Sequence, residues 1–402
     1  MFLGQTGSAT KPGRTDNKAL ADPSSPVEKE PVSVPSTSRR LSHPLSGADL
    51  ATLLRILWSS GGTDRRSLPQ AAVAIASALG RLPFSLAERA YVAAQTHRAE
   101  GPAPVFILGH WRSGTTHLYN ILSKSPQFGY VSPFATGLPW DFLLLGSLVR
   151  PLLERALPDH RYIDNIGVTG VSPQEDELAL ANMTPLSFYH GLYFPRHFDR
   201  LFQEGVFFDG VNARRRQAWE TTLRYLYKKL QIAQPGTRLM IKNPVYTARA
   251  DLLLQMWPEA QFVHIHRNPY KIFVSMRNFY EKLFEQFALQ PYGQVDIDEV
   301  IFATYERMMD KLAADTAELP AERIIHMRYD DLQEAPLSSL DRIYSQLGWS
   351  GFEADRPVFD AYLQSVADYQ KNVFSMPQAL QDRIRARWGR FIDQWDYAAP
   401  AA

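Results

Sequence analysis

Short runs of apolar residues alternate along this chain with longer stretches whose apolar side chains recur every three or four positions. The short runs are 105–108, 238–242, 261–266 and 323–328. The run 105–108 is uninterrupted, as expected of a strand buried on both faces, and the other three, which include a few polar residues, are also predicted to be strands. The periodic stretches between them, such as 213–234, predict amphipathic helices. Strands separated by helices indicate an α/β fold, in which helices flank a parallel sheet.

Composition divides the chain into three regions. Residues 1–45 are rich in Ser, Thr, Pro and charged side chains. We expect this tail to be disordered, because it cannot bury enough apolar surface to offset the entropy of ordering. Residues 46–100 are expected to form a helical N-terminal extension, and residues 101–398 the α/β domain.

Two helices are predicted within the extension, at 71–79 and 86–94. Gly80 and Pro83 lie between them, and both residues disfavour the interior of a helix. We expect the extension to pack against the domain ahead of its first strand.

The overall composition argues against several classes of protein. Lys and Arg number 43 against 42 Asp and Glu, so the net charge of +1 gives no overall field that favours nucleic acid or an anionic membrane. The absence of cysteine excludes disulfides and thiolate zinc sites. No apolar run reaches the length of about 18 residues that a transmembrane helix needs, and the N-terminus shows no signal peptide. We therefore expect a cytoplasmic protein without a transmembrane segment, and leave peripheral membrane contact open.

A glycine-bounded loop follows the first predicted strand. Gly109 and Gly114 enclose it, and Thr115 opens the next helix. Backbone N–H groups and the dipole of a helix start make such a turn an anion cradle. The spacing approaches that of a nucleotide-triphosphate loop, but Thr115 occupies the lysine position and the cation is Arg112, inside the loop. An ordinary tight strand-to-helix turn is the alternative.

Three cationic side chains follow the ends of predicted strands. They are Arg112, Lys242 and Arg267. Because ligands bind at the carboxyl ends of parallel strands, we expect the three to converge on one cleft. Ser275 lies about two helical turns after Arg267, so both side chains can face one anion near that helix start.

Several of these motifs resemble those of the sulfotransferases that use 3′-phosphoadenosine 5′-phosphosulfate (PAPS). Arg112-Ser-Gly-Thr-Thr116 resembles their 5′-phosphosulfate loop, and Arg267 with Ser275 resembles their 3′-phosphate motif. The similarity extends roughly over 104–395, including the segment around 328–332. It implies a P-loop-like sulfotransferase fold and transfer of a sulfuryl group from PAPS, without a metal, to a hydroxyl or amine. The implied donor contacts are Arg112, Ser113, Gly114, Thr115, Thr116, Arg267, Ser275 and Lys371.

The resemblance implies two further catalytic groups beside Arg112. Lys242 is similar to a strand-end lysine that can donate to the leaving oxygen, although a solvated lysine is the alternative. Glu175 lies in a Pro-x-Glu-Asp-Glu stretch similar to that of related bacterial enzymes and is the best candidate for the general base. The same stretch also matches the pattern of a capping box, Ser172-x-x-Glu175, in which Glu175 would serve to cap a helix. Asp176 and Glu177 are weaker candidates.

Histidine is the base in another branch of that family, so five histidines are also candidates. They are His110, His117, His160, His190 and His197. Each is more typical of a packed or surface histidine than of a base, and no pair has zinc-ligand spacing.

Aromatic and apolar stretches bear on the acceptor. Segments 188–208 and 278–287 are rich in aromatic residues, and 138–153 is apolar. Such stretches usually form core, but they favour a hydrophobic or lipid-like acceptor over a bare sugar. Segment 138–153 can be a buried helix, a lid over the acceptor, or an interfacial segment.

Two other functions compete with sulfuryl transfer. A nucleotide-triphosphate-dependent kinase is disfavoured by Thr115 in the loop and by the lack of a clear strand-end aspartate for Mg²⁺. A non-catalytic nucleotide-binding protein is disfavoured because Arg112, Lys242, Arg267 and Ser275 are all present.

Overall fold

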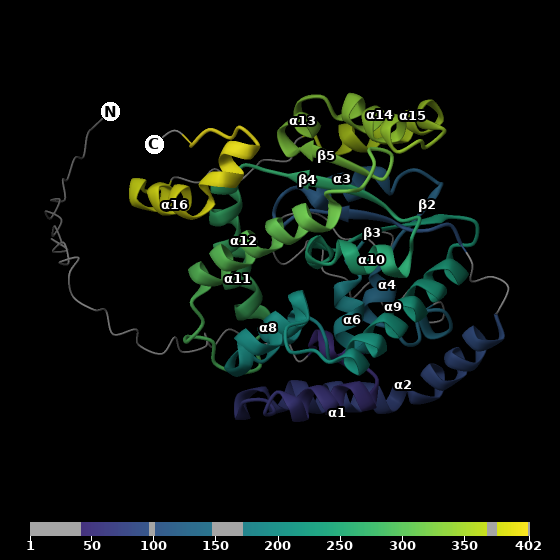
Figure 1. The fold of residues 1–402 in the computed structure, drawn as a ribbon. Helices are drawn as coiled ribbons and strands as arrows, with labels where there is room; N and C mark the ends of the chain where they lie inside the picture. Colours follow the sequence, from purple (N-terminus) through teal and green to yellow (C-terminus); the bar gives the residue numbers. More distant parts are fainter. Residues whose placement is uncertain (1–41, 96–100, 147–171, 368–375, 401–402) are drawn as a thin grey trace, which may run out of the picture.

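A computed structural model of the chain describes residues 42–95, 101–146, 172–367 and 376–400 (Figure 1). Several predictions therefore lie outside the described residues. They concern the tail up to residue 41, His160, Lys371 and the segment 147–153.

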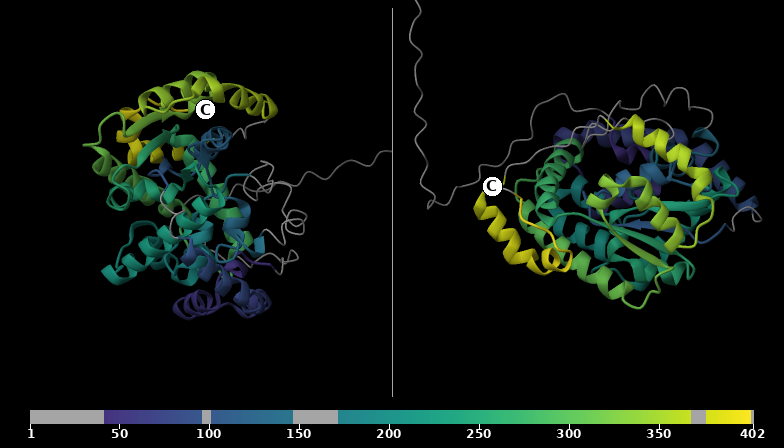
Figure 2. Two further views of the ribbon diagram at one scale, coloured as in Figure 1. Left: turned by 90° about the vertical axis from the view of Figure 1, so that its right-hand side faces the viewer. Right: turned by 90° about the horizontal axis from the view of Figure 1, so that it is seen from above.

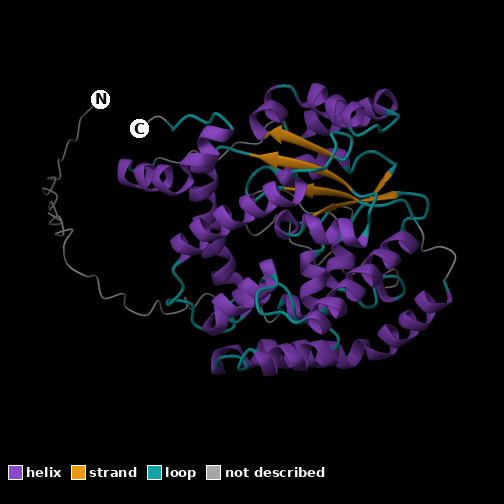
Figure 3. Cartoon of the chain, in the orientation of Figure 1, coloured by secondary structure: helices purple, strands orange, loops and turns teal. Residues whose placement is uncertain are grey.

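Five parallel strands form the central sheet (Figure 3). They are β1 (Val105–Leu108), β2 (Phe128–Gly129), β3 (Arg238–Lys242), β4 (Gln261–His266) and β5 (Ile324–Arg328). Their order is β2-β3-β1-β4-β5, with Ile107 of β1 opposite Lys242 of β3. The parallel sheet and its four predicted strands are confirmed. The two-residue β2 is too short for a periodicity argument to find.

Side chains of β1 alternate between two cores, as a strand covered on both faces requires. Val105 and Ile107 pack with the helices of one layer, which are α3 (Thr115–Leu122), α14 (Pro336–Gln346) and α15 (Phe352–Ser365). Phe106 and Leu108 pack with those of the other, which are α6 (Glu177–Met183), α9 (Ala213–Ala233) and α10 (Ala250–Met256). The first turns of α3 therefore lie against the carboxyl end of β1.

A third core lies beside the sheet and is mainly helical and aromatic. Its helices are α1 (Leu50–Ser59), α2 (Leu68–Ala94), α7 (Tyr189–Tyr193), α8 (Phe198–Phe207), α11 (Pro269–Phe287), α12 (Ile297–Thr316) and α16 (Gln378–Gln394). The remaining helical elements are α4 (Pro133–Gly137), α13 (Tyr329–Glu334) and the 3-10 turns Pro44–Gly47, Arg65–Ser67, Pro195–His197 and Pro244–Ala248. Leu45 is buried in the first of these turns.

The predicted break between two helices in the extension is wrong. A single helix, α2, runs through Gly80 with Pro83 in its interior. Both residues are exposed, so water can donate to the backbone carbonyl that loses its partner because proline has no N–H. Two buried ion pairs also hold the helix to the body on either side of Pro83. Arg81 pairs with Asp141 at 2.9 Å, and Glu88 pairs with Lys229 at 2.6 Å.

The described part of the apolar stretch 138–153 is packed, but not as a helix along its length. Residues 138–144 form turns, in which Asp141 and Phe142 are buried. The N–H group of Leu144 donates to Glu88 of α2 at 2.9 Å, and the Lys229 ammonium donates to the carbonyl of Pro139. These contacts tie residues 138–144 to α2 and α9, which argues against a free lid there.

Candidate active site

Two glycines with positive φ shape the loop between β1 and α3. Gly109 has φ +145° and Gly114 has φ +102°. A Cβ atom on Gly114 would lie 2.1 Å from Cδ2 of Tyr329, and one on Gly109 would lie 2.4 Å from the carbonyl oxygen of Ile265. Neither position can carry a side chain without movement. The loop also holds Arg112 at φ +68°, a left-handed conformation that is uncommon for a non-glycine residue.

The start of α3 supplies hydrogen-bond donors to this loop. Gly114 occupies the cap position and has no side chain to bond the first turn, so the early N–H groups of the helix have no internal acceptor. The N–H group of Leu118 is the first to bond back, to the carbonyl of Gly114 at 3.2 Å. The predicted anion cradle is therefore present in the geometry.

The two predicted phosphate-binding motifs meet at this point. Arg112 Nε donates to Ser275 Oγ at 2.8 Å, and Arg267 Nη1 lies 3.4 Å from the carbonyl oxygen of Arg112. The Arg267 guanidinium stacks over the ring of Tyr329, 4.7 Å from its centroid. Burial lowers the pKa of Arg267, which has Arg112 nearby as a second cation. Two cations held together in this way form a site for an anion.

Two polar atoms beside the cradle are buried and lack a hydrogen-bond partner among the described residues. They are Ser113 Oγ and Arg267 Nε. An unpaired buried donor costs free energy, and such atoms are commonly satisfied by a ligand or an ion. These residues therefore fit a multiply charged anion such as a nucleotide phosphate.

Lys242 and Glu175 face each other across the end of β3. The Lys242 ammonium forms an ion pair with the Glu175 carboxylate and also donates to Thr116 Oγ1 at 3.2 Å. The Lys242 side chain is 1% exposed, whereas that of Glu175 is 14% exposed. A candidate base and a candidate acid are thus in direct contact, beside the first turn of α3.

The capping-box interpretation of Glu175 is wrong. Helix α6 begins at Glu177 with Asp176 as its cap, so Ser172 and Glu175 both precede it. The Glu175 side chain is committed to Lys242 instead.

Asp176 and Glu177 belong to a buried network behind the candidate site. Asp176 accepts hydrogen bonds from the hydroxyl groups of Tyr246 and Tyr227 and from Asn243 Nδ2, the last two at 2.9 Å. Burial raises the pKa of its carboxyl to about 7. Glu177 accepts from the same Asn243 Nδ2 at 2.9 Å, and burial raises its pKa as well. Both carboxyls are fully buried and hold the turn that follows Lys242.

Sequence reasoning missed three positioning residues. Asn243 joins the two buried carboxyls, Thr247 Oγ1 accepts the N–H of Gly109 at 2.8 Å, and Tyr329 covers both Gly114 and Arg267. Each follows the end of β3 or β5. The rule that placed the three cations at strand ends could have drawn attention to them.

Comparisons with known proteins agree with this geometry. Residues 104–354 match the model of the sulfotransferase family. The chain belongs to this family. Its general sulfate donor is PAPS, and its members are transferases, which disfavours the kinase alternative.

Two curated relatives cover much of the chain. The omega-hydroxy-beta-dihydromenaquinone-9 sulfotransferase Stf3 of Mycobacterium bovis is 29% identical over 294 residues, which is 73% of this chain and 75% of that protein. Nodulation protein NoeE of Sinorhizobium fredii is 26% identical over 263 residues, which is 63% of this chain and 52% of that protein.

Solved structures show the same fold. Sulfotransferase STF9 from Mycobacterium avium superposes with a TM-score of 0.59 at 16% identity, over 89% of this chain and 98% of that chain. Sulfotransferase STF1 from Mycobacterium tuberculosis has a TM-score of 0.54 at 17% identity, over 85% and 91%. The predicted α/β sulfotransferase fold is confirmed.

The described histidines of this sulfotransferase are poorly placed to act as bases. His110 and His190 are buried, and each bonds a backbone carbonyl, of Trp111 at 3.0 Å and of Ala181 at 2.9 Å. Burial lowers the pKa of both to about 4. His117 packs edge-on near Tyr329, and His197 is exposed on a 3-10 turn. The described residues contain no group of three metal-ligating side chains.

The aromatic residues predicted to favour a hydrophobic acceptor are mostly core. Phe188, Tyr193 and Phe202 are buried in the helical core, where Phe188 packs edge-on against Trp111 at 5.1 Å. Trp111 precedes Arg112, so this core reaches the sulfotransferase loop.

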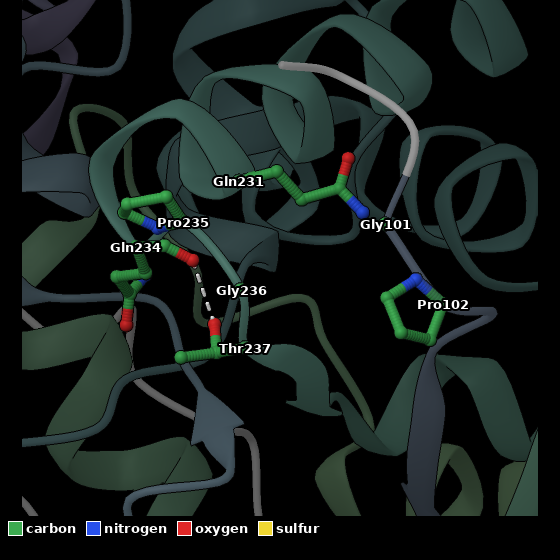
Figure 4. Close-up of a pocket in the computed structure, with 7 residues that line it drawn as sticks. All are labelled: Gly101, Pro102, Gln231, Gln234, Pro235, Gly236 and Thr237. Carbon is green, nitrogen blue, oxygen red and sulfur yellow. Dashed lines mark hydrogen bonds between the residues drawn. The ribbon is translucent and has the colours of Figure 1, made fainter.

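One cavity lies at the opposite edge of the sheet from the loop (Figure 4). It has a volume of about 390 Å³ and is lined by Gly101, Pro102, Gln231, Gln234, Pro235, Gly236 and Thr237. These residues precede β1 and β3, whereas the candidate site lies beyond the carboxyl ends of the same strands. Among the described residues its lining has no charged side chain, and none of these residues belongs to the candidate site.

Proposed function

We propose that this sulfotransferase transfers a sulfuryl group from PAPS to a hydroxyl or amine of a hydrophobic, lipid-like acceptor. The observation that supports this most is the convergence of the loop, the Arg267 and Ser275 motif and the pair Lys242–Glu175 at one edge of the sheet.

The protein would bind PAPS at two groups, the 5′-phosphosulfate and the 3′-phosphate. The N–H groups of Gly114 to Thr116, the Ser113 hydroxyl and the fork of Arg112 would hold the 5′-phosphosulfate. Arg267 and Ser275 would hold the 3′-phosphate. The buried, unpartnered Ser113 Oγ and Arg267 Nε support this arrangement, because a bound anion would give both atoms an acceptor. Lys371 remains a proposed phosphate contact.

Lys242 and Glu175 would share the chemistry of transfer. The acceptor oxygen forms a bond to sulfur while the bond from sulfur to the bridging oxygen breaks. Glu175 takes the proton of the acceptor hydroxyl, and Lys242 donates to the bridging oxygen as that atom gains the electron pair. The ion pair between the two side chains places the Glu175 carboxylate beside the lysine, which also donates to Thr116 Oγ1. No step needs a metal.

The acceptor class is inferred from the relatives. Stf3 is named for a hydroxylated menaquinone, which is lipid-like, and it aligns over 73% of this chain. We infer an acceptor of the same kind, with an apolar body and a terminal hydroxyl.

The nucleotide preference tests the assignment. Titration calorimetry in EDTA should show that adenosine 3′,5′-bisphosphate binds about two decades more tightly than AMP, because two charge-assisted contacts are added. Arg267→Ala should abolish this preference. Arg277→Ala is the matched control, because Arg277 lies on α11, the helix that follows Arg267, and pairs with Asp298. Equal binding of both nucleotides by the wild type would overturn the proposed donor site.

A further inference from the structure

An uncovered apolar face lies on α1 and α2. Nine large apolar side chains on these helices are exposed, against one, Val358, elsewhere in the described part of the chain. Trp58 is 90% exposed, and Leu86 of α2 is 54% exposed. Figures 1 and 2 show the two helices together at one end of the molecule, away from α14 and α15. We call this surface the α1–α2 face.

The outward side of α2 is almost free of charge. The charged residues from Leu68 to Ala94 are Arg81, Glu88 and Arg89. Arg81 and Glu88 are buried and face the protein body, which leaves Arg89 exposed. A concentration of exposed large apolar side chains on two neighbouring helices is typical of an interaction site in a folded protein.

By length and composition the helical segment Arg65–Ala94 could cross a membrane, contrary to the expectation from the sequence. The buried pairs Arg81–Asp141 and Glu88–Lys229 oppose this, because α2 would have to break both to leave the body. The helix is therefore placed to lie along a surface rather than to span a bilayer.

The charges around the α1–α2 face are positive. Arg55, Arg65 and Arg66 are exposed there, whereas the charge of Arg89 is balanced by Asp49. The nearby acidic groups are neutralised: Asp49 pairs with Arg89 at 2.7 Å, and Asp64 lies 3.7 Å from Arg196. A second copy of the chain would bring the same arginines against themselves, which opposes self-association. A surface that carries negative charge is the complementary partner.

We propose that the α1–α2 face docks the protein onto an anionic lipid bilayer. Trp58 and the exposed leucines would enter the interface, where tryptophan is favoured, and the arginines would contact the head groups. The choice of a bilayer as partner rests in part on the proposed lipid-like acceptor, which docking would bring within reach of the enzyme.

Vesicle sedimentation tests the docking. The full chain should sediment with vesicles of phosphatidylglycerol and phosphatidylcholine, and less with phosphatidylcholine alone. Replacing Trp58, Leu79 and Leu86 by Gln should lower the partition coefficient about tenfold or more, because each side chain contributes apolar surface to the bilayer. Arg65→Ala with Arg66→Ala should lower it about fivefold per arginine on the anionic vesicles alone. Val358→Gln, which replaces an exposed apolar residue on α15, should change nothing.

Two outcomes would overturn the proposal. One is equal sedimentation of the wild type and the triple variant. The other is a wild-type dimer in light scattering that the triple variant converts to a monomer, since the face would then bind a second copy. Adenosine 3′,5′-bisphosphate should bind the triple variant as tightly as the wild type, which shows that it is folded. Because neither assay uses the acceptor, failure of the docking is distinguishable from failure of the proposed reaction.

Discussion

Replacing Glu175 by Gln separates a base from a structural carboxylate. Glutamine keeps an oxygen that can accept from Lys242 but can no longer take the acceptor proton. General-base catalysis is worth about 10²–10⁴ in rate, so we expect the turnover number to fall by at least about a hundredfold. The lysine side chain is 1% exposed and loses a charged partner. The bond that remains keeps its charged donor, the Lys242 ammonium, and has a neutral acceptor; this weakening costs about 1 kcal/mol, so the melting temperature should fall by only a few degrees.

Glu204→Gln is the control for the loss of stability. Glu204 of α8 pairs with Arg215 at 2.6 Å, and its side chain is 11% exposed, similar to the 14% of Glu175. The control should lose comparable stability and keep full turnover, measured as sulfated product by mass spectrometry. The bisphosphate affinity of both variants should be unchanged. A Glu175→Gln enzyme with wild-type turnover would refute the assignment of the base.

Three further predictions concern the loop and the buried network. Arg112→Ala should abolish turnover in a protein that circular dichroism shows to be folded. Arg112→Lys should retain a little turnover, because lysine keeps the positive charge but lacks the paired donors of the guanidinium. Gly114→Ala should weaken bisphosphate binding in calorimetry, and Tyr329→Ala should partly restore it by removing the ring that the new Cβ meets. Burial raises the pKa of the Asp176 carboxyl to about 7, so stability should decrease as the pH rises from about 4 to 7, and Asp176→Asn should flatten this decrease in urea unfolding.

The sheet was predictable from the short apolar runs in the sequence. The cluster of cations was predictable from the rule that ligands bind at the carboxyl ends of parallel strands. Four apolar runs became strands, and the strand-end rule placed Arg112, Lys242 and Arg267 at one edge. The geometry of parallel strands makes such residues neighbours whatever lies between them in sequence. In this chain the ends of the short, buried strands therefore predicted the position of the site, which the helices did not.

The path of α2 was not predictable because its determinants are distant in sequence. Pro83 lowers the local preference for helix, but Arg81 and Glu88 are held by Asp141 and Lys229, which lie 60 and 141 positions further on. Local propensity cannot include such partners. The same pairs turn the apolar side of α2 outward, so the exposed face and the failed prediction have one cause.

The three consecutive carboxyls at 175–177 show where sequence reasoning stops. All three could start a helix or serve as a base, and the capping pattern at Ser172 favoured the wrong helix start. The fold separates them through partners on β3 and after it. Asn243 binds Asp176 and Glu177 and thereby sets the start of α6, while Lys242, one position earlier, takes Glu175. Lys242 and Asn243 are adjacent in sequence, and so are the carboxyls that they bind. Lys242 therefore places Glu175 in the candidate site, whereas Asn243 places Asp176 and Glu177 in the buried network. A shift of one residue in either segment, 175–177 or 242–243, would change which carboxyl lies in the candidate site and which lies in the buried network.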